Sequence, residues 1–96
     1  MITEIALLNV TAGNTEAFEN AFAKAQTIIS SMKGYIKHNL QKCIEDDHQY
    51  LLVVEWETLE DHTESFRKSE MYKEWKELLH HFYDPFPTVQ HYQKIF

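Results

Sequence analysis

Four aromatic rings and three histidines gather in one stretch near the C-terminal end of the chain. Residues 62–82 contain Phe66, Tyr72, Trp75 and Phe82 together with His62, His80 and His81. Aromatic faces can hold a flat ligand, an imidazole can exchange a proton near neutral pH, and a phenol can hydrogen-bond to a ligand oxygen. The stretch therefore indicates either a packed core stripe or the wall of a pocket in which proton transfer occurs.

His62 and Tyr72 are the candidate catalytic residues. His62 precedes Phe66 by four positions, so the two side chains share one face of a helix. An imidazole in a pocket could take a proton from a phenol or an enol, whereas the alternative for His62 is an ordinary surface histidine. A buried Tyr72 hydroxyl needs a hydrogen-bond partner, and a bound oxygenated ring could provide one.

Three further residues are candidates for substrate binding. Phe66 and Trp75 could stack against a flat ring, or they could pack in the core with the rest of the aromatic stripe. His38 lies on a predicted strand, where it points either to the same cavity or to a subunit interface. These three residues complete the predicted site.

Composition and spacing argue against several other kinds of site. The chain has six histidines, but no two are four residues apart and no HExxH motif occurs, so we expect no metal. Cys43 is the single cysteine, which excludes an internal disulfide and any multi-cysteine metal site. The net charge of −6 and the lack of a basic run argue against binding to nucleic acid.

The chain length and the N-terminal sequence indicate a soluble protein. A chain of 96 residues is expected to form one domain, residues 1–96. The N-terminal segment MITEIALLNV lacks a basic region, and its apolar run is too short to span a membrane. A lone thiol fits a reducing compartment, so a cytoplasmic location is expected.

Hydrophobic periodicity predicts four strands and two helical regions in the order β-α-β-β-α-β. The predicted strands are residues 2–10, 35–43, 50–56 and 88–96, and the helical regions are 15–29, 58–66 and 69–81. Asn14 and Ser69 are expected to begin helices as N-caps, and the second helical region is expected to break near Lys68. This order favours an α+β, ferredoxin-like fold with a four-stranded antiparallel sheet.

Both faces of the predicted sheet carry apolar side chains. Ile5 and Leu7 alternate with Ala6 and Leu8 in the first strand, and the third strand is apolar on both faces as well. An aromatic content of 14% is also high for one small core, which indicates an interface or a ligand cavity. Helices can cover only one face of such a sheet, so we expect the other face to pack against a second copy in an isologous homodimer.

With these elements in place, the chain resembles the antibiotic biosynthesis monooxygenase (ABM) family of dimeric α+β barrel proteins. The resemblance covers roughly residues 2–95 and rests on three segments in order: the TAG after the first strand, VVEWETLEDH, and FRKSEMY. The family includes cofactor-independent quinone-forming monooxygenases, heme-degrading monooxygenases and isomerase-like members. The resemblance therefore implies the fold and a small hydrophobic or aromatic ligand, but not one reaction.

Individual positions distinguish these branches. In the quinone-forming branch, an Asn, a Trp and a Tyr are linked to the site. Their positions correspond here to His62, Phe66 and Tyr72, so only the tyrosine is kept. In the heme-degrading branch the iron-ligating histidine corresponds to Lys76, and the strand-one Asn corresponds to a position near Ala6. A lysine cannot replace a neutral imidazole as the axial ligand, which disfavours heme degradation.

The resemblance leads to one main functional hypothesis and two alternatives. The main hypothesis is a monooxygenase that needs no flavin, heme, metal or other cofactor and acts on an electron-rich aromatic or enol. The first alternative is a binding module of the same fold that holds a small molecule without turnover. The second is an isomerase that uses the same base and needs no O2.

Overall fold

A computed structural model describes all residues from 1 to 96 and shows the predicted β-α-β-β-α-β order. The main elements are β1 (Ile2–Asn9), α1 (Thr15–Ile29), β2 (Tyr35–Lys42), β3 (Gln49–Trp56), α2 (Glu70–Leu79) and β4 (Val89–Tyr92). Two short helical segments flank α2: η1 (Asp61–Phe66) precedes it and η2 (His80–Phe82) follows it. The predicted break in the second helical region is therefore confirmed.

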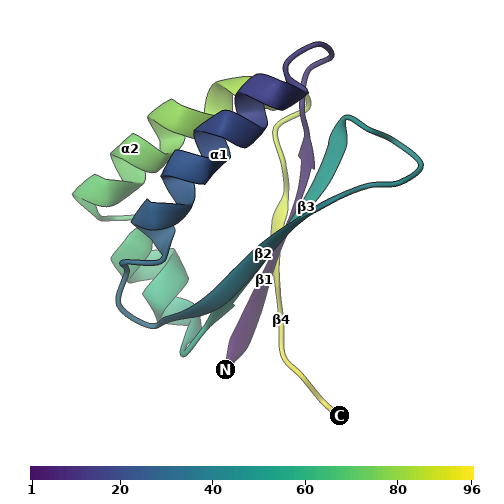
Figure 1. Cartoon of the computed structure of the whole chain (residues 1–96). Helices are drawn as coiled ribbons and strands as arrows, with labels where there is room; N and C mark the ends of the chain where they lie inside the picture. The colour runs from purple at the N-terminus through teal and green to yellow at the C-terminus, as the bar shows by residue number, and fades with distance from the viewer.

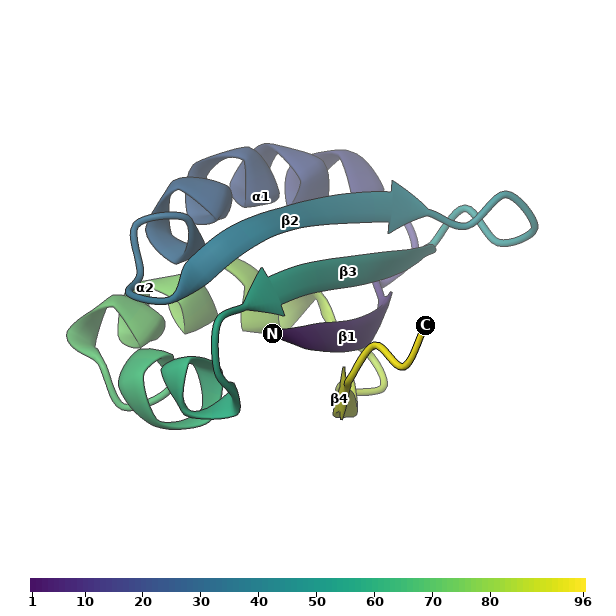
Figure 2. The same ribbon diagram turned by 90° about the horizontal axis from the view of Figure 1, so that it is seen from below.

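The four strands form one antiparallel sheet in the order β2-β3-β1-β4. Both long helices lie on the same face of this sheet, as Figure 1 shows. In the perpendicular view the broken helical region lies near the N-terminal end of β1 and the C-terminal end of β3 (Figure 2). The ferredoxin-like fold predicted from the sequence is confirmed. The longest helix has 15 residues and none has the length and hydropathy of a membrane span.

Side-chain alternation decides which strand residues reach the helices. Ala6 and Leu8 of β1 are buried on the helix side, and Trp56 of β3 is completely buried there. The intervening residues point to the other face, where Leu7 remains 44% exposed. No element of the chain itself covers that face, so the homodimer stays a prediction at this point.

Capping side chains fix the start of each piece of the broken helix. The hydroxyl of Ser69 accepts a hydrogen bond from the backbone N–H of Tyr72 at 3.2 Å, which confirms Ser69 as an N-cap. Thr58 and Asp61 bond each other reciprocally, each through its side chain to the other's backbone N–H at 3.2 Å. Asn14 precedes α1 as predicted, but its side chain bonds Thr11 instead of the helix.

The last strand is shorter than the predicted range 88–96. It pairs only with β1, from Ala6 opposite Val89 to Thr3 opposite Tyr92. The strand ends at Tyr92, and residues 93–96 lie outside the sheet.

Candidate active site

A cavity of about 450 Å³ lies between the helix side of the sheet and the broken helical region. Its wall is formed by Glu4, Ala6, Leu8, Leu52, His62, Phe66, Arg67, Tyr72, Trp75, His80, Tyr83, Phe86, Pro87 and Val89. Most of these side chains are apolar or aromatic. The volume and lining suit a small ring-containing ligand.

The structure brings together four of the five site residues predicted from the sequence. His62, Phe66, Tyr72 and Trp75 all line this cavity. His38 does not, because its side chain lies between β2, to which it belongs, and α1. There its Nε2 donates to Gln26 Oε1 at 3.1 Å and its Nδ1 faces the hydroxyl of Tyr35.

Three aromatic side chains form a continuous wall of the cavity. The ring of Phe66 stands edge-on to that of Tyr72, with 5.2 Å between centroids, and edge-on to that of Trp75 at 5.7 Å. Phe66 and Trp75 are buried, whereas Tyr72 is half-buried and its hydroxyl makes no hydrogen bond within the chain. Burial raises the pKa of Tyr72, so this hydroxyl stays protonated at neutral pH and is free to donate to a ligand.

A buried glutamate, which the sequence interpretation missed, faces the same cavity. Glu4 is only 5% exposed, and its Oε1 accepts a hydrogen bond from the indole Nε1–H of Trp56 at 2.9 Å. His62 Nε2 lies 3.3 Å from the same oxygen. The other carboxyl oxygen, Oε2, has no hydrogen-bond partner within the chain. Every fully buried side-chain nitrogen and oxygen of the chain has a partner, so Oε2 is accessible and faces the cavity that Glu4 lines.

Burial raises the pKa of the Glu4 carboxyl to about 7, although the Trp56 hydrogen bond and the Arg67 charge both act in the opposite direction. A carboxyl group is ordinarily ionised well below this pH. Glu4 therefore gains and loses its proton close to neutral pH, as a general acid or base must.

His62 supports this carboxyl from one side. It is 3% exposed and stacks on Trp56, with ring centroids 5.4 Å apart and an interplanar angle of 17°. Burial lowers the pKa of His62 to about 3, helped by the nearby charges of Arg67 and His91, so its ring is neutral at pH 7. A neutral ring that donates from Nε2 to Glu4 has Nδ1 as its acceptor atom.

His91 completes a chain of three titratable groups. Its Nε2 lies 2.8 Å from His62 Nδ1. When His62 donates from Nε2 to Glu4, its Nδ1 accepts a hydrogen bond from His91 Nε2–H. His91 lies directly opposite Glu4 in the β1–β4 pairing, which places both side chains on the helix face of the sheet. Burial lowers the pKa of His91, and this residue is half-buried at the sheet edge. The chain of groups thus runs from the cavity to the surface.

The backbone of η1 accounts for the position of His62. This segment is a π-helix, in which the N–H of Arg67 bonds the carbonyl oxygen of His62 five residues earlier at 3.1 Å. Such wide turns occur mostly as single turns and are common at functional sites. Here the π-helix directs His62 and Phe66 toward Trp56, with ring centroids of Trp56 and Phe66 5.9 Å apart.

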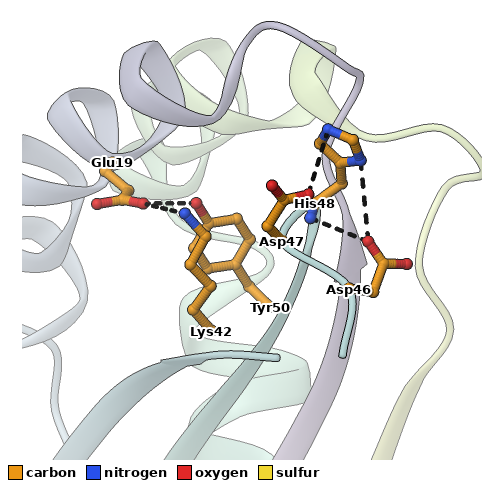
Figure 3. Close-up of polar contacts among 6 residues, drawn as sticks. All are labelled: Glu19, Lys42, Asp46, Asp47, His48 and Tyr50. Atoms are coloured by element: carbon orange, nitrogen blue, oxygen red, sulfur yellow. Dashed lines mark hydrogen bonds and ion pairs between the residues drawn. The ribbon is translucent and has the colours of Figure 1, made fainter. Parts of the chain in front are cut away.

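A second polar cluster lies in the β2–β3 turn, far from the aromatic wall. Figure 3 shows the side chains of Asp46 and Asp47 around His48, all three exposed. The backbone N–H of His48 donates to Asp46 Oδ1 at 3.0 Å, an ordinary turn contact. Nearby, Tyr50 donates to Glu19 at 2.6 Å and joins β3 to α1 (Figure 3). These contacts explain the cluster as a stabilised turn.

Comparison with known proteins places this chain in a family. Residues 1–78 match the family model described as "Antibiotic biosynthesis monooxygenase". The chain belongs to this family. The resemblance noted from the sequence is therefore confirmed.

Individual relatives extend this comparison over the whole chain. The chain is 60% identical over 95 residues to uncharacterized protein YczJ of Bacillus subtilis (strain 168), covering 99% of this chain and all of that protein. A crystal structure from Bordetella bronchiseptica described under the same family is 35% identical with a TM-score of 0.94, covering 99% and 97% of the two chains. A mutant of SnoaB from Streptomyces nogalater, described as a cofactor-independent oxygenase, also has a crystal structure. It is 16% identical with a TM-score of 0.75, covering 99% and 93%, a likeness of fold alone.

Proposed function

We propose that this protein is a cofactor-independent monooxygenase that converts an electron-rich aromatic or enol to a quinone-type product. The observation that carries the proposal is the Glu4 carboxyl, which is buried beside an aromatic-walled cavity with a pKa of about 7 and one open oxygen. Membership of the family supports it. The shared fold with SnoaB, described as a cofactor-independent oxygenase, is consistent with it.

A base and a dry cavity are sufficient for this chemistry. Triplet O2 reacts slowly with closed-shell molecules, but a carbanion or phenolate can pass one electron to it, and the radical pair can then combine. The protein must bind a flat ring, remove one proton and keep bulk water away from the anion. The apolar wall and the Glu4 carboxylate provide these functions.

The atoms balance for a ring methylene such as that of anthrone. Glu4 takes one proton from the CH2 group, and the carbanion combines with O2 to form a peroxide anion. Glu4 then returns its proton to the outer oxygen, giving a hydroperoxide. Loss of the remaining C–H proton together with hydroxide breaks the O–O bond and yields a C=O group and one water molecule. The substrate supplies both hydrogens and all the electrons.

The proposed roles follow from which atoms are free. Both ring nitrogens of His62 are engaged, whereas Glu4 Oε2 is open, so the proton-accepting role predicted for His62 passes to Glu4. His62 orients the carboxyl instead. Tyr72 donates its hydroxyl proton in a hydrogen bond to the developing oxyanion, and Phe66 and Trp75 hold the ring.

The pH dependence of oxygen consumption tests the function. With anthrone and no added cofactor, the protein is expected to consume O2 and form anthraquinone at a rate that rises with pH through about 7. The rise follows because Glu4 accepts a proton only when ionised, and burial raises its pKa to about 7. The measurement is an oxygen electrode between pH 5 and 9, with the enzyme-free rate subtracted at each pH.

Three results would contradict the proposal. One is a rate equal to the enzyme-free control, which favours the binding module. Another is conversion of an enolic substrate at full rate without oxygen, which favours the isomerase. The third is a rate that falls as pH rises through 7, since that would require a protonated group where the mechanism needs an ionised one.

We also propose that the outer face of the sheet is covered by a second copy of the chain. Leu7 is 44% exposed on that face and pairs with the half-buried Leu51, and Ile5 pairs there with the half-buried Val53, so the face presents contiguous apolar side chains. Sedimentation equilibrium is expected to give twice the chain mass of 11.5 kDa. Leu7→Lys should lower the mass toward one chain, while Ile44→Lys, in the 94% exposed loop position, should not. A single-chain mass for the unmodified protein would contradict the dimer.

A further inference from the structure

Arg67 is the only arginine of the chain, and it stands at the cavity without a partner. It follows η1 directly, is exposed, and lines the cavity, which places it where the cavity meets solvent. Its guanidinium takes part in none of the ion pairs and none of the side-chain hydrogen bonds of the chain. Five N–H donors are thus available to a ligand.

Glu4 and Arg67 are opposite charges that line the same cavity without forming an ion pair. The rest of the wall holds no lysine and no other acidic residue. Burial lowers the pKa of His80, so that histidine is neutral as well. The cavity wall therefore carries one carboxyl group and one cation among apolar and aromatic side chains.

The positive charge of Arg67 acts across the whole cavity. Burial has the larger effect on the pKa of Glu4 and raises it, whereas the Arg67 charge lowers it. For His62 and His91, burial and the Arg67 charge both lower the pKa. This charge also opposes the burial that raises the pKa of Tyr72. The guanidinium is therefore near enough to interact with a ligand in contact with these groups.

We propose that Arg67 binds a carboxylate of the substrate while Glu4 faces the acidic proton at the other end. The substrate is then a hydroxylated aromatic or enolic carboxylic acid rather than a neutral phenol. A guanidinium matches a carboxylate with two parallel N–H···O bonds, and a single cation balances a single negative charge. The role of Glu4 toward the acidic proton of the substrate rests on the proposed function. Binding of the substrate's carboxylate rests on Arg67 alone.

The overall charge of the protein makes this local cation decisive. The chain has a net charge of −6, so its general field disfavours anionic ligands. A cation at the site can offset this field and favour a carboxylate over its neutral ester. In the cavity wall that cation is Arg67.

Binding of a matched pair of probes tests the inference. We expect 2,5-dihydroxybenzoate to bind at least about tenfold more tightly than its methyl ester, and Arg67→Gln to remove that preference, because charge-assisted hydrogen bonds to the carboxylate are lost. Affinity for the ester should change by no more than about twofold. Lys68→Gln is the matched control, since the adjacent Lys68 pairs with Glu64 outside the cavity wall. Isothermal titration calorimetry under nitrogen measures all of these affinities.

The inference would be overturned if the unmodified protein bound acid and ester equally well, or bound neither. It would also be overturned if Arg67→Gln weakened binding of acid and ester equally, or if Lys68→Gln removed the preference for the acid as Arg67→Gln does. Oxygen is absent from these titrations, so their result is independent of turnover. A protein that selects the acid but never consumes O2 would support the role of Arg67 and contradict the monooxygenase. A protein that oxidises anthrone but binds acid and ester equally would support the monooxygenase and contradict the role of Arg67.

Discussion

Replacing Glu4 with glutamine is expected to lower the rate of oxygen consumption by at least about a hundredfold, in the range usual for loss of a general base. The amide has the same shape and can still accept the hydrogen bond from Trp56 that Oε1 accepts at 2.9 Å. It cannot take a proton. The loss should therefore appear in kcat, with little change in the affinity for a non-reacting ligand.

Two measurements separate this loss of chemistry from a loss of structure. Glu57→Gln, at an exposed position just after β3, removes the same charge outside the cavity and should leave the rate unchanged. Thermal unfolding above pH 7 should show Glu4→Gln to be at least as stable as the unmodified protein. An active Glu4→Gln variant would show that another group takes the proton.

The direction of the stability effect follows from the pKa of Glu4, which burial raises from 4.5 to about 7. Between these two values the folded protein holds a proton that the unfolded chain has lost. The contribution of Glu4 to stability is therefore fully present below about pH 4.5 and is lost as pH rises to about 7. The glutamine variant lacks this dependence, so the two stability curves should converge toward acid pH.

Replacing Gly34 with alanine is expected to destabilise the fold by at least about 3 kcal/mol, a size tied to overpacking together with backbone strain. Gly34 has a φ of 82°, which favours glycine, and an added methyl group would overlap the carboxyl of Asp61. Asp61 exchanges hydrogen bonds with Thr58 at the start of the segment that carries His62. The clash should therefore loosen η1 as well as the turn.

Gly13 provides the matched control because it has the same φ of 82° but no atom within 4 Å of an added methyl group. Gly13→Ala should cost only about 1–2 kcal/mol, the ordinary penalty for a left-handed residue with a side chain. Urea denaturation of the two variants measures the difference. Equal costs would show that Asp61 moves aside freely and does not hold η1 in place.

Regular periodicity made the fold and much of the aromatic wall predictable from sequence. Phe66, Tyr72 and Trp75 lie on a helical pattern with a break, and this local pattern is enough to place them on one side of the sheet. Alternation along the strand also predicted that the His38 side chain points away from solvent. This pattern does not show whether the side chain enters the cavity or the space between β2 and α1. There Tyr35 and Gln26 already engage it.

Residues that meet only through tertiary structure were not predictable in this way. Glu4 contacts Trp56, 52 positions away, and His62 contacts His91, 29 positions away. The one available signal for Glu4 was strand alternation, which places it on the same face of β1 as the buried Ala6 and Leu8. The π-helical turn that directs His62 toward Glu4 also has no distinct sequence pattern, because its hydrogen bonds span only one residue more than those of an α-helix.

The pairing of β1 between β3 and β4 has a further consequence for how this chain can change. Because side chains in a strand alternate, a single-residue insertion or deletion between Glu4 and Leu8 would rotate the carboxylate to the outer face and turn its neighbour inward. Length changes within this part of the N-terminal strand are thus compatible with the proposed role of Glu4 only in steps of two.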